Sequence, residues 1–250
     1  MNEYAEGVDD ARDVDIAEGQ EVMPFYIILD QSGSMSADLG TLHSAVQEIV
    51  AELRADAATD DTALLGVISF GSTARVTIPL SRLSNIESVE PLTILGGTNF
   101  SSAWETYDRA VRADTAAIKA KNGSYHRPCV FFLTDGQPDH NDRGRFRDTF
   151  LRLQGAEANK AWPYVVAYGF RDADVEVLKS IAYPDFGEKR GEYFLFKNAD
   201  IKSVIAQVKH LINQTVIRAS AAAASSQPNL QAARPAPASD IAHGTVDATF

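Results

Sequence analysis

The sequence predicts an α/β fold, a three-layer, doubly wound and mostly parallel sheet with one antiparallel edge strand. Short apolar runs alternate with amphipathic segments along the 250 residues, which is the pattern of repeated strand–helix–strand units. Most of these runs are almost continuously apolar, so we expect helices to cover both faces of the sheet. Two of the runs end in an aspartate, at the strand ends where such folds carry their ligand sites.

Six segments are expected to form strands. Five are buried runs, at residues 25–29, 63–70, 128–134, 163–170 and 192–196. The sixth, residues 74–80, alternates apolar and polar residues after a Gly71–Ser72 turn, so it is expected to form a hairpin at the sheet edge. The single cysteine, Cys129, lies within an apolar run and is expected to be a small buried strand residue.

The segments between the strands predict helices, because their apolar residues recur about every 3.6 positions. The helical segments cover residues 42–53, 103–111, 143–157, 178–181 and 201–212. Asp172 and Asp174 mark the start of the fourth helix, and Asn198 or Asp200 is expected to cap the last. Trp104 and Tyr107 share the apolar stripe of the second helix and are therefore predicted core residues.

The composition divides the chain into three regions. Residues 1–21 contain eight acidic residues against Arg12 alone, which predicts an acidic flexible tail. Residues 22–218 carry the strand and helix patterns of the domain. Residues 219–250 are rich in Ala, Pro and Ser and predict a second flexible tail.

The composition also excludes several functions. A net charge of -11 argues against binding to nucleic acid, because phosphates require a basic surface. No apolar run approaches the length of about 20 residues that spans a bilayer, so we expect no membrane insertion. The chain begins without a secretory-signal pattern and holds one cysteine, so we expect a cytoplasmic protein.

Two predicted strands end in an acid that could belong to a site. The run "FYIILD" ends at Asp30, and "CVFFLTD" ends at Asp135. In a doubly wound sheet the corresponding strands are neighbours where the strand order reverses, and ligands bind there at the carboxyl ends. We therefore expect both carboxylates to face one crevice, where they repel each other unless a cation neutralises them.

Hydroxyl side chains accompany these acids. Ser32 and Ser34 alternate with the first aspartate along a loop, so the three side chains can project to the same side. Thr98 lies just before a predicted helix, and the two glycines that precede it allow a close backbone approach. Carboxylate and hydroxyl oxygens suit Mg²⁺, Mn²⁺ or Ca²⁺ and bind zinc poorly. The sequence therefore predicts a divalent-metal site at this edge of the sheet.

Residues next to these ligands are expected to support them. Four such residues lie in the segments that carry Thr98 and Asp135: Gly97, Asn99, Gly136 and Asp139. Asp139 and Asp142 lie in a proline-containing loop. There we expect solvated acids, although water-mediated contacts with the metal are the alternative.

The three loops resemble the metal-ion-dependent adhesion site (MIDAS) of von Willebrand factor A (VWA) domains. The matching segments are "DQSGSMS", "GGTNF" and "LTDGQPD". The resemblance covers about residues 22–218, and it implies an intact set of ligands: Asp30, Ser32, Ser34, Thr98 and Asp135. The segments "YIILDQSGSM", "VAELRAD" and "GVISFGSTARVTIPL" are also similar to those of bacterial cytoplasmic members, including proteins of tellurite-resistance clusters.

This resemblance implies a binding module with a Rossmann-like sheet. In VWA domains the metal keeps one coordination position open, and an Asp or Glu of a protein partner completes it. The resemblance to tellurite-resistance proteins implies an adaptor in a toxic-anion or stress response, with kinase-like or phosphatase-like partners.

Two other interpretations of the "DQSGSMS" segment remain open. The simpler one is a strand-to-helix turn in which Ser and Asp cap a helix. The enzymatic one is a Mg²⁺-dependent phosphatase in which Asp30 is the nucleophile and Asp135 holds the metal. Enzymes of that kind require a second acid two residues after the nucleophile, where this chain has Ser32. The chain also lacks a Gly-x-Ser-x-Gly or phosphate-loop motif, so we expect no enzymatic activity.

Overall fold

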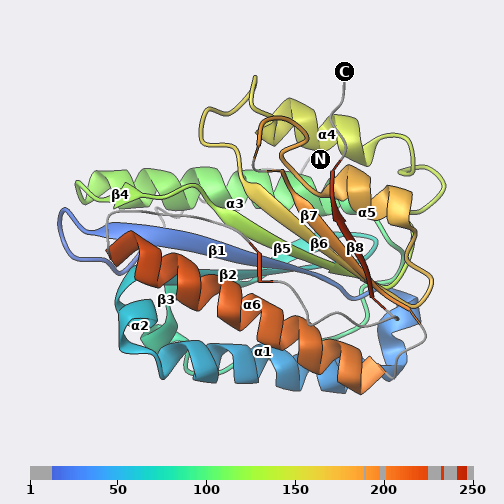
Figure 1. The fold of residues 1–250 in the computed structure, drawn as a ribbon, viewed down its shortest axis with the longest axis horizontal. Coiled ribbons are helices and arrows are strands. Elements are labelled where there is room, and N and C mark those ends of the chain that lie inside the picture. The colour runs from blue at the N-terminus through green and yellow to red at the C-terminus, as the bar shows by residue number, and fades with distance from the viewer. Residues whose placement is uncertain (1–12, 189, 198–200, 225–231, 234–240, 247–250) are drawn as a thin grey trace, which may run out of the picture.

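Among the residues that the structure describes, eight strands form a sheet that is the middle layer (Figure 1). The computed structural model describes residues 13–188, 190–197, 201–224, 232–233 and 241–246. The strands are β1 (Glu21–Asp30), β2 (Ala63–Phe70), β3 (Ala74–Arg82), β4 (Ser124–Tyr125), β5 (Cys129–Thr134), β6 (Tyr164–Phe170), β7 (Glu192–Phe196) and β8 (Ile241–Thr245). Their order is β3-β2-β1-β5-β6-β7-β8, and β4 pairs with β1.

The strand order confirms the predicted doubly wound sheet. The chain builds outward from β1 through β2 to β3, then returns to the other side of β1 and builds outward through β5, β6 and β7. The pairs within this central group are parallel, whereas β3 pairs antiparallel with β2 as predicted. The prediction of one antiparallel edge strand is wrong, because β8 forms a second at the opposite edge.

Strand β8 is the largest difference between the sequence-based expectation and the structure. Residues 241–245 belong to the segment that the sequence assigns to the C-terminal tail, yet they pair with β7. In this antiparallel register Thr245 lies opposite Glu192, and Ile241 lies opposite Phe196. The open edge of β7 supplies unpaired backbone groups, and the imidazole of His243 stacks on Phe194 at 6.0 Å between ring centroids. A strand that depends on such an edge has no strong signal in its own composition.

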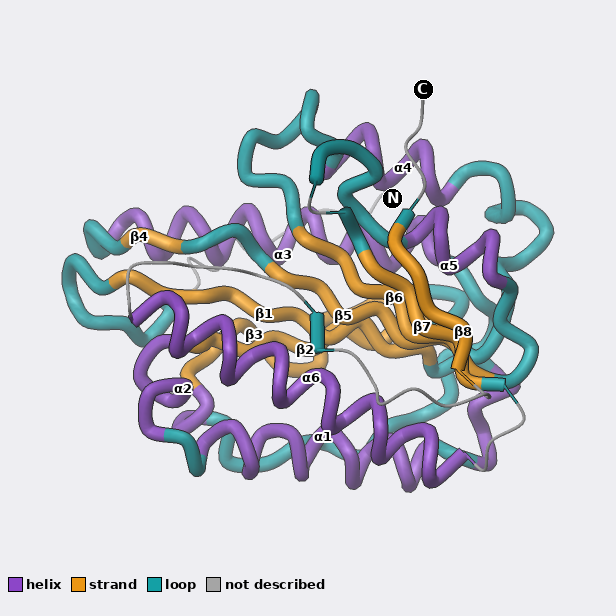
Figure 2. The backbone as a smooth tube through the Cα atoms, in the orientation of Figure 1, coloured by secondary structure: helices purple, strands orange, loops and turns teal. Residues whose placement is uncertain are grey.

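Six α-helices cover the two faces of the sheet. They are α1 (Leu39–Arg54), α2 (Ala57–Thr62), α3 (Phe100–Ala120), α4 (Phe146–Gln154), α5 (Val175–Ile181) and α6 (Ile201–Ala224) among the described residues. Helices α1, α2 and α6 lie on one face, and α3, α4 and α5 on the other (Figures 1 and 2). Two short 3₁₀ helices, Gly33–Ala37 and Leu83–Asn85, complete the elements.

The five predicted helices are present, and their caps explain some of the boundaries. Asp174 begins α5 by accepting a hydrogen bond from the backbone nitrogen of Glu176 at 2.7 Å. Helix α6 continues to Ala224 because alanine is the best helix former. The predicted caps Asn198 and Asp200 lie outside the described residues. Helix α2 was not predicted, since its six residues, "AATDDT", have no apolar stripe.

An aromatic cluster fixes the beginning of α3 against the sheet. Phe100 is buried and packs edge-on against Phe70, Phe132 and Phe146, with ring centroids 5.1–5.6 Å apart. Trp104 lies 5.1 Å from Phe132, again between ring centroids. The cluster holds the first turn of α3 two residues after Thr98, and it thereby positions a predicted metal ligand.

The sequence-based assignments to the core are confirmed. Trp104, Tyr107 and Cys129 are fully buried, and burial raises the pKa of the Cys129 thiol far above its ordinary range. Among the helices of the described residues, none combines the length and the apolar character needed to cross a bilayer.

We expect Phe132→Ala to lower the free energy of unfolding by about 3–5 kcal/mol, because it leaves a cavity at the centre of the aromatic cluster. Urea denaturation followed by circular dichroism measures this loss. Leu151→Ala, at a side chain of α4 that is 38% exposed, is the matched control and should cost about 1 kcal/mol or less. Equal losses for the two variants would contradict the role of the cluster.

Candidate metal centre

The predicted site lies where the strand order reverses. Asp30 is the last residue of β1, and Asp135 directly follows β5. These strands are parallel neighbours, with Leu29 opposite Leu133. Their carboxyl ends therefore meet at one edge of the sheet, as the sequence predicts.

Hydroxyl groups link the first loop of the site to the third. The Oγ atoms of Ser32 and Ser34 are 3.0 Å apart, and the Ser34 hydroxyl donates to Oδ1 of Asp135 at 2.8 Å. Ser34 is exposed, whereas Ser32 and Asp135 are buried. Four of the five predicted ligands, Asp30 included, thus lie in one hydrogen-bonded network that opens to solvent at Ser34.

Asp30 is the most deeply buried member of this network. Its Oδ1 accepts from the backbone nitrogen of Ser32 at 2.8 Å, and its Oδ2 accepts from the hydroxyl of Thr134 at 2.6 Å. Burial raises the pKa of Asp30 from its ordinary value of 3.8 to about 6. The hydrogen bonds from Thr134 and Ser32 oppose this increase, and the charge of Asp135 adds to it.

The loop that carries Thr98 packs directly on the first loop. The backbone nitrogen of Gly33 donates to the carbonyl oxygen of Gly96 at 2.8 Å, and that of Leu95 donates to the carbonyl oxygen of Gln31 at 2.8 Å. Thr98 is buried beside this contact. Within the described part of the chain, its hydroxyl makes no hydrogen bond to the other four predicted ligands.

Asp139 holds the Thr98 loop in place from the third loop. Its Oδ2 accepts from the backbone nitrogen of Thr98 at 3.0 Å, and its own backbone nitrogen donates to the Thr98 carbonyl oxygen at 2.9 Å. A Cβ atom on Gly97 would lie 2.5 Å from that Oδ2, so the close approach requires glycine at this position. Asp139 therefore supports the site by fixing the backbone.

The expectation that Asp142 is a solvated acid is wrong. Its side chain is buried and accepts hydrogen bonds from the backbone nitrogen of Ser101, at 3.0 Å, and from the Ser101 hydroxyl. Asp139 is exposed but also engaged, as described above. Both acids connect the loop after Asp135 to the beginning of α3. Hydrogen bonds between distant segments of this kind cannot be recognised from the composition of the loop.

The remaining supporting residues have local structural roles. Asn99 caps α3 by accepting a hydrogen bond from the backbone nitrogen of Ser102 at 2.8 Å. Gly136 donates its backbone hydrogen to the hydroxyl of Thr134 at 3.3 Å. These contacts fix the backbone on either side of Thr98 and Asp135.

Three residues of the site were missed by the sequence-based reasoning. Thr134 bonds Asp30, and Arg171 donates to Oδ2 of Asp135 at 3.2 Å and pairs with Asp38. A signal for two of them was present, because Thr134 ends β5 and Arg171 directly follows β6. Residues at the carboxyl ends of neighbouring parallel strands share one edge of the sheet.

The donor set fits a divalent cation. The carboxylates of Asp30 and Asp135 lie beside the hydroxyl groups of Ser32 and Ser34, and all of these oxygen atoms are hard ligands. No group of three or more His, Cys, Asp or Glu side chains suited to a metal occurs among the described residues. A metal at this site would therefore depend on serine and threonine hydroxyls together with Asp30 and Asp135.

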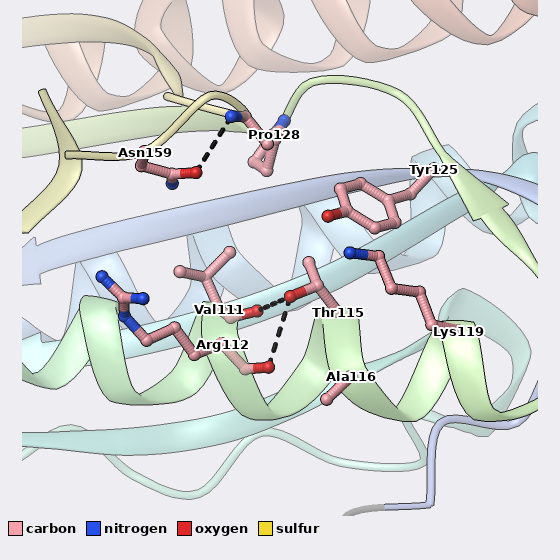
Figure 3. Close-up of a pocket in the computed structure, with 9 residues that line it drawn as sticks. Val111, Arg112, Thr115, Ala116, Lys119, Tyr125, Pro128 and Asn159 are labelled. Carbon is pink, nitrogen blue, oxygen red and sulfur yellow. Dashed lines mark hydrogen bonds between the residues drawn. The ribbon is translucent and has the colours of Figure 1, made fainter. Parts of the chain in front are cut away.

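Away from this site, a hollow of ≈ 380 Å³ lies beside the second half of α3 (Figure 3). Two of its polar side chains are already engaged. The Thr115 hydroxyl donates to the carbonyl oxygen of Val111 at 2.7 Å, and Arg112 pairs with Asp108 at 2.7 Å. The hollow also borders Pro128, just before β5, and so lies at the opposite edge of the sheet from Asp135. We assign no function to it.

Comparisons with known proteins agree with this architecture. Residues 25–137 match the family model of the von Willebrand factor type A domain. The chain resembles proximal thread matrix protein 1 of the mussel byssus, with 16% identity and a TM-score of 0.53 over 80% of this chain and 47% of that protein. It also resembles the pilus adhesin SpaC of Lactobacillus rhamnosus GG, with 15% identity and a TM-score of 0.59 over 81% of this chain and 31% of that one.

A third similar structure is a variant of the PilB minor pilin of Streptococcus sanguinis, with 13% identity and a TM-score of 0.57 over 86% of this chain and 65% of that one. The chain therefore spans less than two thirds of each of these proteins. Another structure of the mussel protein, with 17% identity and a TM-score of 0.50 over 79% of this chain and 47% of that one, has a zinc-occupied MIDAS motif. No curated protein gives a significant match.

Identities this low show a shared fold, and the family match covers the first two loops and the beginning of the third. The strand order, with its reversal at β1, is the same type of doubly wound sheet that the sequence predicts. Residues 25–137 are therefore similar in sequence to the von Willebrand factor type A domain, and the doubly wound sheet is consistent with that match.

Proposed function

We propose that this chain is a divalent-metal-dependent protein-binding module. Five side chains would hold the metal: Asp30, Ser32, Ser34, Thr98 and Asp135. The observation that carries the proposal is the hydroxyl network that runs from Ser32 through Ser34 to Asp135, beside the buried Asp30. A carboxylate of a partner protein, from an Asp or Glu, would complete the coordination of the metal.

The chemistry of the donors favours Mg²⁺, with Mn²⁺ or Ca²⁺ as substitutes. Three of the five proposed metal ligands are neutral hydroxyl groups, so only the two carboxylates offset the positive charge of the cation. A cation held in this way still attracts an anionic ligand. Ser34 is the exposed member of the network, and a partner would therefore reach the metal from its side.

The phosphatase alternative finds less support in the geometry. A nucleophilic carboxylate needs a free oxygen that can reach the substrate. Asp30 is fully buried, and both of its oxygens accept hydrogen bonds, from Ser32 and Thr134. Ser32 also occupies the position where such an enzyme needs a second acid. We therefore propose a module without catalytic activity.

The wider role is proposed from the sequence resemblance. The segments around Asp30 and along β2 and β3 are similar to those of bacterial tellurite-resistance proteins. We accordingly propose a cytoplasmic adaptor in a toxic-anion or stress response, with a kinase-like or phosphatase-like partner. The module would occupy residues 22–218 between two tails, with β8 added to its sheet from the second tail.

Ser34→Ala should weaken Mg²⁺ or Mn²⁺ binding by at least about tenfold, because it removes one donor and the hydrogen bond that orients Asp135. Isothermal titration calorimetry measures the change. Ser36→Ala is the matched control, since Ser36 is an exposed serine two residues further along the same loop. Equal affinities in the two variants would exclude Ser34 as a ligand.

Without divalent ions, the protein should lose stability as the pH rises. The folded-state pKa of Asp30, about 6, lies above the unfolded value of about 4. The contribution of Asp30 to stability is thus fully present below about pH 4 and is lost as the pH rises through about 6. Thermal unfolding in a chelator measures this, with Asp30→Asn as the reference. An identical pH dependence in the two proteins would contradict the raised pKa.

Metal-dependent capture distinguishes a binding module from an enzyme. The immobilised chain should retain a bacterial protein in Mg²⁺ and release it in EDTA, and Ser34→Ala should retain none while Ser36→Ala still does. Mass spectrometry identifies the retained protein, and replacing its Asp and Glu residues tests the carboxylate contact. Turnover of a generic phosphoester that depends on Mg²⁺ and on Asp30 would support the phosphatase instead.

A further inference from the structure

Arg171 joins three parts of the candidate metal centre. It directly follows β6, the strand next to β5. Its Nη1 donates to the carbonyl oxygen of Ser34 at 3.0 Å and to Oδ2 of Asp135 at 3.2 Å, and its Nη2 pairs with Asp38 at the start of α1. One guanidinium group therefore contacts the first loop, the third loop and a helix end.

The surroundings of Arg171 show that this placement is imposed by the fold. Its φ angle is 55°, in the left-handed region that residues other than glycine seldom adopt. The side chains of Asp135 and Asp38 are only 1% and 6% exposed. Charges that are removed from water interact strongly, and an unpaired buried carboxylate is costly. Among the ion pairs of the described residues, Arg171 is the only cation that contacts either acid.

The two oxygens of Asp135 have different partners. Oδ1 accepts from the Ser34 hydroxyl, whereas Oδ2 accepts from Arg171. A cation among the hydroxyls would therefore share this carboxylate with the guanidinium group. The cation and the guanidinium group would each reduce the negative charge that Asp135 offers to the other.

We propose that Arg171 is an internal counter-cation that sets the affinity of the site for divalent ions. This inference rests on the proposed function. In the metal-free protein the guanidinium group neutralises Asp135 and Asp38, which stabilises that state. In the metal-bound protein the same group repels the ion. Both effects favour the metal-free state, so Arg171 keeps the affinity below what the oxygen donors alone would give.

Titration calorimetry with Mg²⁺ and with Mn²⁺ tests the proposal on the full chain. Arg171→Gln and Arg171→Met should each bind the ion about tenfold more tightly than the wild type. Glutamine retains hydrogen-bonding capacity, so it serves as the second variant if the methionine variant does not fold. Arg171→Lys retains the charge and should bind close to the wild-type level, although lysine lacks the fork that spans two carboxylates.

Arg112→Met is the matched control for net charge. It removes one arginine and one ion pair at the hollow beside α3, and it should leave the metal affinity unchanged. Thermal unfolding gives an independent measurement. Arg171→Gln should lower the midpoint of the metal-free protein, and saturating Mg²⁺ should raise that midpoint by more than it does in the wild type.

The possible results separate the two proposals. Tighter metal binding in Arg171→Gln supports the inference, because damage to the fold would weaken the binding instead. Unchanged or weaker binding in both Arg171→Gln and Arg171→Met, with normal binding by the wild type, overturns the inference alone. Absence of Mg²⁺ and Mn²⁺ binding by the wild type overturns the proposed function and this inference with it.

Discussion

Two buried carboxyl groups, Asp30 and Asp135, lie at the ends of adjacent parallel strands, and the cost of burying them is the constraint on which the site depends. The fold creates this arrangement, because the strand order reverses between β1 and β5. Each neighbouring group relieves part of the electrostatic cost. Thr134 and the backbone of Ser32 donate to Asp30, while Ser34 and Arg171 donate to Asp135. A divalent cation would complete this neutralisation more fully than hydrogen bonds can.

The loops that carry the donors are tied to one another as well as to the sheet. Gly33 bonds the Thr98 loop, and Asp139 bonds the same loop from the other side. Below them, the aromatic cluster around Phe100 and Phe132 fixes the first turn of α3. Such cross-links fix the loops that carry the five proposed donors before a ligand arrives. A site held in this way loses little conformational entropy when it binds.

The fold was largely predictable because its signals are local. The apolar runs that became β1, β2, β5, β6 and β7 are continuous in the sequence, and the apolar stripes of α1, α3 and α6 have a clear helical period. Strand β8 was not predictable in this way. Its residues, "IAHGT", form a strand because they pair with the open edge of β7. The surrounding sequence is rich in Ala, Pro and Ser and gives no indication of this pairing.

The same distinction applies to the site. The sequence by itself determined the chemical types of the proposed ligands and their order, because Asp30, Ser32 and Ser34 are near neighbours in one loop and Asp135 ends a strand. Only the tertiary structure revealed Arg171 beside Asp135, Thr134 on Asp30 and Asp139 on Thr98. These contacts join residues that are 36 to 104 positions apart in the chain. Their energies depend on distance and burial in the folded protein, and neither quantity is written in the local sequence pattern.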